Sequence, residues 1–155
     1  PSRAWLAHDG EALLVAFEND LDPAQAPATQ AQWGANDAVE IALRDPAGGE
    51  KAPILVLRGY VNGVFQSSAE AGAPAAAVER AAVGVQYAAR LVSPASWTAE
   101  WRIPLTSLGL VPGSISALQA NLSVRKPAGD KWLMWQATNG YTWLVANAGR
   151  IEFDK

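Results

Sequence analysis

Two segments of the chain alternate between large apolar side chains on one face and polar or small ones on the other, and this pattern limits the fold more than any other feature. The segments are 38–44 and 97–104. Their apolar residues lie two apart, as they do on the buried face of a half-covered β-strand. Those residues are Val39, Ile41 and Leu43 in the first segment and Trp97, Ala99, Trp101 and Ile103 in the second. We expect both segments to be strands that bury these side chains in one core.

Turn signals divide the rest of the chain into further short strands. His8-Asp9-Gly10 predicts a hairpin between strands 3–7 and 11–19, and Asn62-Gly63 predicts a hairpin with a two-residue type I′ turn. Residues 20–35 lack periodicity and are expected to form a long surface loop. The Ala-rich stretch 69–82 is read as a loop leading into a strand over 83–91, because Gly72 and Pro74 interrupt it. About ten strands and no helix predict an all-β fold, an antiparallel β-sandwich of the jelly-roll kind.

The size and charge of the chain exclude several classes of function. At 155 residues it suits one domain over 1–155, and its net charge of −3 disfavours nucleic acid and anionic membranes as partners. The absence of cysteine excludes disulfides, zinc-thiolate sites and cysteine nucleophiles. No apolar run approaches the roughly 20 residues of a membrane span. We therefore expect a small or neutral partner.

The aromatic residues are dominated by seven Trp, against three Phe and three Tyr. A Trp side chain has a flat apolar face and an N–H group that needs a partner, so it is less suited to a core than Leu or Phe. Trp97 and Trp101 share the apolar face of their strand and are expected in the core. Trp132 and Trp135 cannot share one strand face, so one of them should be exposed. Some of the remaining Trp are then candidates for ligand contact.

Several motifs, in this order and spacing, resemble the family 9 carbohydrate-binding modules and their relatives among the DOMON-like sandwiches. They are the strand 9–17, Asn36-Asp37-Ala38-Val39-Glu40-Ile41, the strand 97–105, Asn121-Leu122-Ser123-Val124-Arg125, Trp132 to Trp135, and Gly149 to Phe153. The resemblance implies a non-catalytic sugar-binding module, tethered to other domains of a secreted bacterial protein and located outside the cell or in the periplasm. The first strands of such modules have no counterpart before Arg3, which implies a trimmed or shortened variant with an exposed sheet edge.

The resemblance also implies a binding site, in which two aromatic rings hold a sugar and polar side chains hold its hydroxyl groups. A pyranose has an apolar C–H face and a rim of hydroxyls, so flat rings with acidic, basic and amide groups suit it. Glu40 and Arg58 have a simpler reading as a surface ion pair across two strands, and Asn139-Gly140 as an ordinary turn. The residues carried over to this sequence are Trp33, Glu40, Arg58, Asn139 and Trp143, with Tyr141 as an alternative to Trp143.

A calcium site is a further possibility at the start of the loop after residue 19. Asn19, Asp20 and Asp22 offer oxygen atoms of the kind that Ca²⁺ prefers, and such sites occur in the family. A solvated turn explains the same residues. A sugar-binding module requires no cofactor, and a structural Ca²⁺ is possible in it.

Three other functions remain open at this stage. A haem-binding electron-transfer domain of the DOMON type would use Met134 and His8, the only Met and His of the chain. A glycoside hydrolase needs two carboxylates roughly 5 to 10 Å apart, and Glu40 and Glu100 are the candidates. A structural or protein-interaction sandwich without a sugar site is the third.

Overall fold

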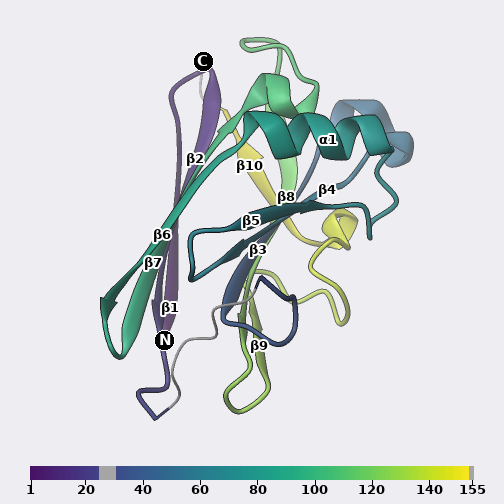
Figure 1. Cartoon of the computed structure of the whole chain (residues 1–155). Coiled ribbons are helices and arrows are strands. Elements are labelled where there is room, and N and C mark those ends of the chain that lie inside the picture. Colours follow the sequence, from purple (N-terminus) through teal and green to yellow (C-terminus); the bar gives the residue numbers. More distant parts are fainter. Residues whose placement is uncertain (25–30, 154–155) are drawn as a thin grey trace.

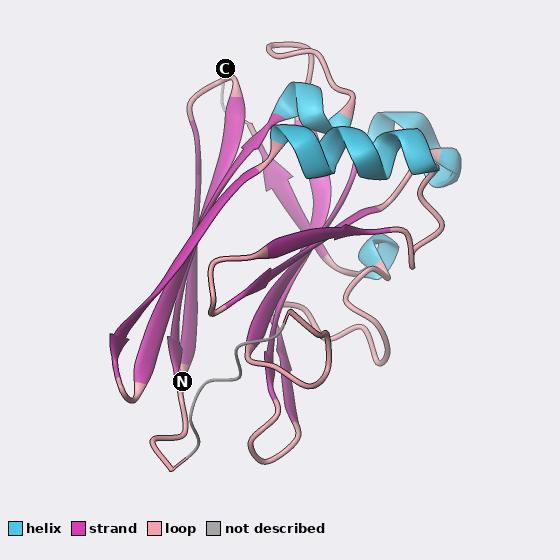
Figure 2. Ribbon diagram, in the orientation of Figure 1, coloured by secondary structure: helices cyan, strands magenta, loops and turns pink. Residues whose placement is uncertain are grey.

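A computed structural model of the chain shows two antiparallel sheets packed face to face (Figures 1 and 2), and it describes residues 1–24 and 31–153. The antiparallel β-sandwich is therefore confirmed. Sheet A has the order β1 (Ser2–His8), β2 (Ala12–Asp20), β7 (Ser96–Pro104) and β6 (Gln86–Ser93). Sheet B has the order β10 (Gly149–Glu152), β8 (Ala117–Lys126), β3 (Ala38–Arg44), β4 (Leu55–Tyr60) and β5 (Phe65–Ser68), with β9 (Lys131–Met134) also paired to β8.

The core lies between the two sheets and contains the side chains that the alternation predicts. Trp97 and Trp101 are 0% and 2% exposed, and Val39, Ile41, Leu43, Val85 and Ile103 are also buried. Tyr87 is only half-buried, and its hydroxyl donates to the backbone oxygen of the buried Tyr60 at 2.8 Å. The faces assigned to strands β3 and β7 are therefore confirmed.

The turn between β4 and β5 differs from the prediction. A type I′ turn needs positive φ at both central residues, but only Gly63 has one, at 83°. The amide of Gly63 donates to the oxygen of Tyr60 at 3.0 Å, so the turn spans Tyr60 to Gly63 and places Val61 and Asn62 at its centre. The hairpin itself is confirmed, as is the one between β1 and β2.

The prediction of no helix was wrong. Residues Ala75–Gly84 form α1, which lies across one end of the sandwich (Figure 1), and the following strand, β6, begins only at Gln86. Pro74 does not interrupt this helix but precedes its first turn, where the missing N–H costs nothing. Ala77 and Ala81, four residues apart, are buried against the core.

Short 3₁₀ helices over Pro46–Lys51, Leu105–Leu108 and Val145–Asn147 complete the structure. Of the predicted loop 20–35, residues 25–30 lie outside the described part.

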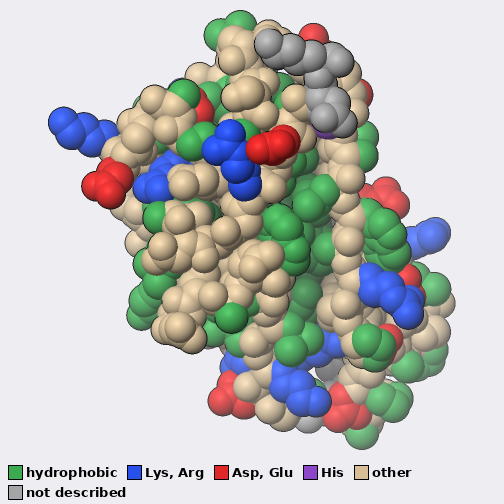
Figure 3. Space-filling model, turned by 180° about the vertical axis from the view of Figure 1, so that it is seen from behind, with side chains coloured by type: hydrophobic (Ala, Val, Ile, Leu, Met, Phe, Trp, Pro, Cys, Tyr) green, Lys and Arg blue, Asp and Glu red, His purple; other side chains and the backbone are tan. Residues whose placement is uncertain are grey.

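One flank of the sandwich is open. Seen from behind, hydrophobic side chains gather in a furrow along the middle of the molecule (Figure 3). A groove of about 290 Å³ lies between β1 and the strands β8 and β9, with Leu6, Phe17, Val124 and Trp135 in its lining. Strand β1 is the edge of sheet A at this flank.

In the described part of the chain, no helix is long and apolar enough to cross a membrane.

Gly59 is expected to tolerate no side chain, because two core rings occupy the space beside it. A Cβ atom there would lie 2.4 Å from the ring of Tyr87 and 2.5 Å from that of Trp101. Both rings are held by packing, so Gly59→Ala should cost about 1 to 3 kcal/mol of the free energy of unfolding. Chemical denaturation would measure this, with Gly63→Ala as a control whose cost comes from its positive φ and not from a clash. Equal stability of Gly59→Ala and the wild type would contradict the packing described here.

Candidate functional site

A row of aligned polar residues crosses the outer face of sheet B. The strand register pairs Glu40 on β3 with Ser123 on β8 and with Arg58 on β4, and it pairs Arg58 with Gln66 on β5. Side chains directly opposite one another on neighbouring strands point to the same face. The antiparallel register thus brings residues that are far apart in the sequence into one line.

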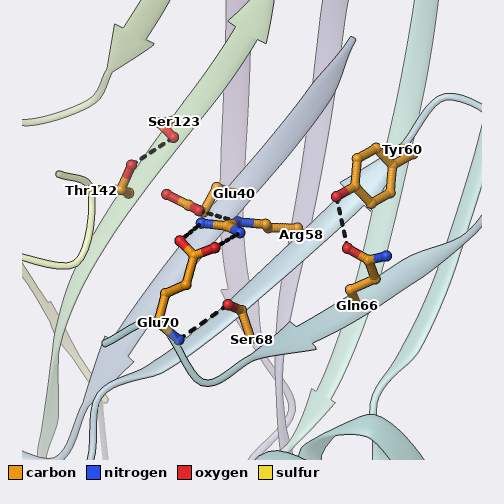
Figure 4. A network of polar contacts seen from close by, with 8 residues as sticks. All are labelled: Glu40, Arg58, Tyr60, Gln66, Ser68, Glu70, Ser123 and Thr142. Atoms are coloured by element: carbon orange, nitrogen blue, oxygen red, sulfur yellow. Dashed lines mark hydrogen bonds and ion pairs between the residues drawn. The ribbon is translucent and has the colours of Figure 1, made fainter. Parts of the chain in front are cut away.

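Arg58 is the centre of a buried charged cluster (Figure 4). Its Nε donates to Glu40 Oε2 at 2.6 Å, and its two terminal nitrogens donate to the two oxygens of Glu70 at 3.0 and 2.7 Å. The side chains of Arg58 and Glu40 are 4% and 0% exposed. The alternative reading of this pair as a surface ion pair was therefore wrong about its location. Burial disfavours the charged form of Arg58, but the hydrogen bonds to Glu70 and Glu40 outweigh it and raise its pKa.

The carboxylate of Glu40 is only partly satisfied. Burial raises the pKa of Glu40, and the hydrogen bond and positive charge of Arg58 oppose this shift. The Thr142 hydroxyl donates to Ser123 Oγ at 2.8 Å, and Glu40 Oε1 has no hydrogen-bond partner among the described residues. A buried acceptor without a partner carries a desolvation cost that a hydroxyl donor would relieve. Glu70 has the opposite shift, because its hydrogen bonds from Arg58 lower its pKa.

Four aromatic side chains surround this cluster. The ring centroids of Trp33 and Trp143 lie 4.5 and 5.8 Å from the Arg58 guanidinium carbon. Trp132 meets Trp33 edge to face at 6.1 Å, and Tyr141 stacks on Trp143 at 4.4 Å with an interplanar angle of 3°. Tyr141 is 55% exposed, and Trp33 and Trp143 are half-buried. The site therefore has flat apolar surfaces next to buried hydrogen-bonding groups.

Local hydrogen bonds hold the two loops that carry these rings. Gln66 Nε2 donates to the backbone oxygen of Ala31 at 3.2 Å, and Asn36 Oδ1 accepts from the amide of Gln32 at 3.2 Å, which closes a turn around Trp33. The bond from Thr142 to Ser123 fixes the second loop between Tyr141 and Trp143. Each loop is thus tied to sheet B, and the positions of its rings are determined by the sheet.

Comparison with known proteins bears on this arrangement. No protein-family model and no curated protein sequence matches the chain. Among solved structures, a family 9 carbohydrate-binding module from Caldicellulosiruptor kristjanssonii in complex with glucose superposes with a TM-score of 0.70 at 18% identity, over 97% of this chain and 75% of that one. The complex of such a module with cellotriose gives 0.68 at 19% identity, over 97% and 74%.

A proposed carbohydrate-binding protein from Bacteroides uniformis superposes with a TM-score of 0.60 at 14% identity, over 99% of this chain and 78% of that one. The fold is that of the family 9 modules. At these identities the likeness shows the fold alone and says nothing of which residues form a site.

Within this family 9 fold, the structure brings together five of the six residues that the resemblance implied. Trp33, Glu40, Arg58, Tyr141 and Trp143 form one continuous cluster. Asn139 lies on the loop of Tyr141, is exposed, and adopts a left-handed φ of 57°, as an ordinary turn residue does.

Sequence reasoning missed three parts of the cluster. Glu70 follows β5 in the Ala-rich stretch, and Thr142 lies between the two expected aromatic residues. Trp132 was expected only to differ in orientation from Trp135. It does so, because Trp132 contacts Trp33 and Tyr141 whereas Trp135 lies against Gly149. One of these two Trp was expected to be exposed, and both are, at 37% and 44%. Trp132 pairs with Arg125 of β8 and lies on the same face of sheet B, a register that residues 131–134 do not reveal by alternation.

The structure does not bring the candidate calcium ligands together. Asn19 is fully buried, and neither polar atom of its side chain has a partner among the described residues. Asp20, next to it on β2, points to the other face and contacts the N-terminal nitrogen of Pro1 at 2.6 Å. Asp22 Oδ1 accepts from the amide of Ala24 at 2.9 Å. In the described ranges, no three His, Asp or Glu side chains converge as metal ligands.

The residue pairs of the alternative functions are also far from one another. Glu40 lies on the outer face of sheet B and Glu100 on the outer face of sheet A, so the two carboxylates face away from each other across the sandwich. They cannot act on one glycosidic bond. His8 packs against Phe153, and Met134 Sδ accepts from the Thr138 hydroxyl. His8 and Met134 therefore contact different residues and do not form a pair of haem ligands in this structure.

Proposed function

We propose that the chain is a non-catalytic carbohydrate-binding module whose site is the aromatic and charged cluster on the outer face of sheet B. The observation that supports this most is the pair of indoles, Trp33 and Trp143, whose centroids lie 4.5 and 5.8 Å from the guanidinium carbon of a buried Arg58. A sugar ring would pack its C–H faces on the indoles, and its hydroxyls would exchange hydrogen bonds with the charged groups.

The distances are compatible with such a sandwich. A ring in van der Waals contact with two parallel indoles needs their centroids roughly 7 to 8 Å apart. The two distances from the Arg58 guanidinium carbon, 4.5 and 5.8 Å, set an upper limit on the separation of the two centroids, and this limit exceeds 7 to 8 Å. Tyr141, stacked on Trp143, would support that indole or offer a second platform.

Binding of a small sugar should be weak. A disaccharide has about two dozen heavy atoms, and roughly 0.3 kcal/mol for each suggests a limit near −7 kcal/mol, a Kd on the order of 10 μM. Isothermal titration calorimetry with glucose and cellotriose, the sugars in the superposed structures, tests this first. A gel-retardation screen across plant, algal and microbial polysaccharides extends the search. No retardation by any of them and no heat with either sugar would contradict the proposal.

Glu40→Gln is expected to weaken sugar binding about tenfold or more. The substitution keeps the shape of the side chain but removes the charge that holds Arg58 Nε at 2.6 Å, and a charge-assisted hydrogen bond contributes about 1.5 to 3 kcal/mol. Glu70→Gln is the matched control, because Glu70 holds the same Arg58 but is 54% exposed and contributes less. Calorimetry measures the sugar affinity of both variants and of the wild type. If Glu40→Gln binds the sugar as tightly as the wild type, Glu40 is not part of the site.

We also propose a test for a structural Ca²⁺ at the start of the loop after Asn19. Such an ion would need an arrangement of this loop other than the one described, because Asn19 and Asp20 lie on opposite faces of β2. An ion that binds the folded chain alone stabilises it by RT ln(1 + [L]/Kd). We therefore expect a higher melting temperature in millimolar CaCl₂ than in EDTA. Identical melting curves in the two solutions would exclude the ion.

The proposed carbohydrate binding also suggests how the module is used in a longer protein. We propose that it is tethered to other domains of a secreted protein, such as a carbohydrate-active enzyme, and that it holds them on a polysaccharide outside the cell or in the periplasm.

A further inference from the structure

The outer face of sheet A is open, unlike that of sheet B. In Figure 1, no helix or loop of the described residues lies over it. It carries Trp5, an indole that is 52% exposed on the edge strand β1. Trp5 lies outside the cluster on sheet B, and nothing in the proposed site uses it.

Trp5 borders a hollow of about 430 Å³ on this face. The register aligns Trp5 with Ala16, Ala16 with Glu100, and Glu100 with Ala88, so one row crosses all four strands. The row is low at Ala16, between the indole and the carboxylate, and again at Ala88, on the other side of the carboxylate. The hollow is therefore a trough with an aromatic ring at one side.

A second hollow of about 300 Å³ continues the first. It shares Ala88 and Glu100 with it and adds Arg90 and Thr98, which the register pairs one row further along the strands. Rows on one face of a sheet lie roughly 7 Å apart, and four strands span about 14 Å. The combined trough is thus long enough for several units of a linear polymer.

The trough offers hydrogen-bonding groups that the protein itself does not use. Within the described ranges, the side chains of Gln86, Arg90, Thr98 and Glu100 have no hydrogen-bond or ion-pair partner, whereas Arg102 is paired with Asp9 at 3.0 Å. Arg90 and Glu100 carry opposite charges, so the face favours neither an anionic nor a cationic polymer. An exposed indole beside unpaired donors and acceptors is suited to a neutral polyhydroxyl chain.

We propose that this trough is a second carbohydrate site, which binds an internal segment of a neutral linear polysaccharide with Trp5 as its stacking platform. The class of ligand rests on the carbohydrate binding proposed above, but the location is independent of it. Together the two sites, on opposite faces of the sandwich, would let one module contact two chains.

Affinity electrophoresis through gels containing hydroxyethyl cellulose, β-1,4-xylan or galactomannan tests this. We expect at least one of the three to retard the wild-type protein and Trp5→Ala to weaken that retardation tenfold or more. Trp135→Ala is the matched control, because Trp135 is similarly exposed at 44% but lies in the groove between the sheets. Circular dichroism and thermal unfolding show that each variant is folded. Glu100→Gln should weaken retardation by a smaller factor.

The outcomes separate this site from the one on sheet B. Trp33→Ala should lose binding of glucose and cellotriose in calorimetry but retain retardation by the polysaccharide, and Trp5→Ala should do the reverse. If Trp5→Ala is retarded like the wild type, or if none of the three polymers retards the wild type, the second site is overturned, whatever the fate of the first. A dimer in sedimentation velocity that Trp5→Ala converts to a monomer would also overturn it, because a second copy would then cover the trough.

Discussion

Trp33→Ala is expected to abolish measurable binding of small sugars. Trp33 is half-buried against Arg58, and in the proposed site the exposed part of its ring packs on the sugar. Its removal therefore takes away one of the two stacking faces. Loss of a central aromatic contact typically costs about 2 to 4 kcal/mol of binding free energy, a factor of roughly 30 to 1,000. From a Kd on the order of 10 μM this leads to values that calorimetry does not detect.

Trp143→Ala should have the same effect. Tyr141→Ala should have a smaller one, because Tyr141 is more exposed than Trp143 and acts on the sugar mainly by supporting the Trp143 ring on which it stacks. Trp135→Ala, outside the cluster, controls for the loss of a partly exposed indole. Unfolding curves should remain close to the wild type for all four variants. If both Trp33→Ala and Trp143→Ala bind like the wild type, the sugar site lies elsewhere, and Trp132 is the next residue to test.

Trp101→Ala is expected to lower the free energy of unfolding by about 3 to 5 kcal/mol. Trp101 is 2% exposed and packs on Tyr87 at 4.3 Å and on Phe65 at 5.6 Å, so its ring joins the two sheets. The cost combines lost transfer energy with the cavity that remains. The Trp101 Nε1 group is buried without a partner among the described residues, so Trp101→Phe, which removes this group and keeps a ring, should cost less.

Urea denaturation measures this, with Trp5→Ala as the control on the same sheet, where an exposed position should change stability by under about 1 kcal/mol. A change of under about 1 kcal/mol for Trp101→Ala would place its ring outside the core and would shift the faces of β7 by one residue.

Alternation along the chain by itself determined the sandwich. Period-2 patterns around Val39 and Trp101 assign each side chain to a face, because a strand turns successive residues to opposite sides. The same local rule places Glu40 on the face opposite Val39, whereas the joint choice of Glu40 and Arg58 came from the family resemblance and their pairing from the register of β3 and β4. Turn residues such as Asp9-Gly10 mark the hairpins, although the turn type at Asn62-Gly63 depends on the backbone of residues on both sides of it.

Only the tertiary structure decided the rest. The segment of α1 has too weak a periodicity to specify a helix alone, and its Ala77 and Ala81 become informative once a core exists for them to cover. Whether the pair of Glu40 and Arg58 is exposed or buried depends on loops from distant parts of the chain, which bring Trp33 and Trp143 over it. Contacts such as that of Glu70 with Arg58 join loops to strands, and no spacing in the sequence specifies where a loop lies against a sheet.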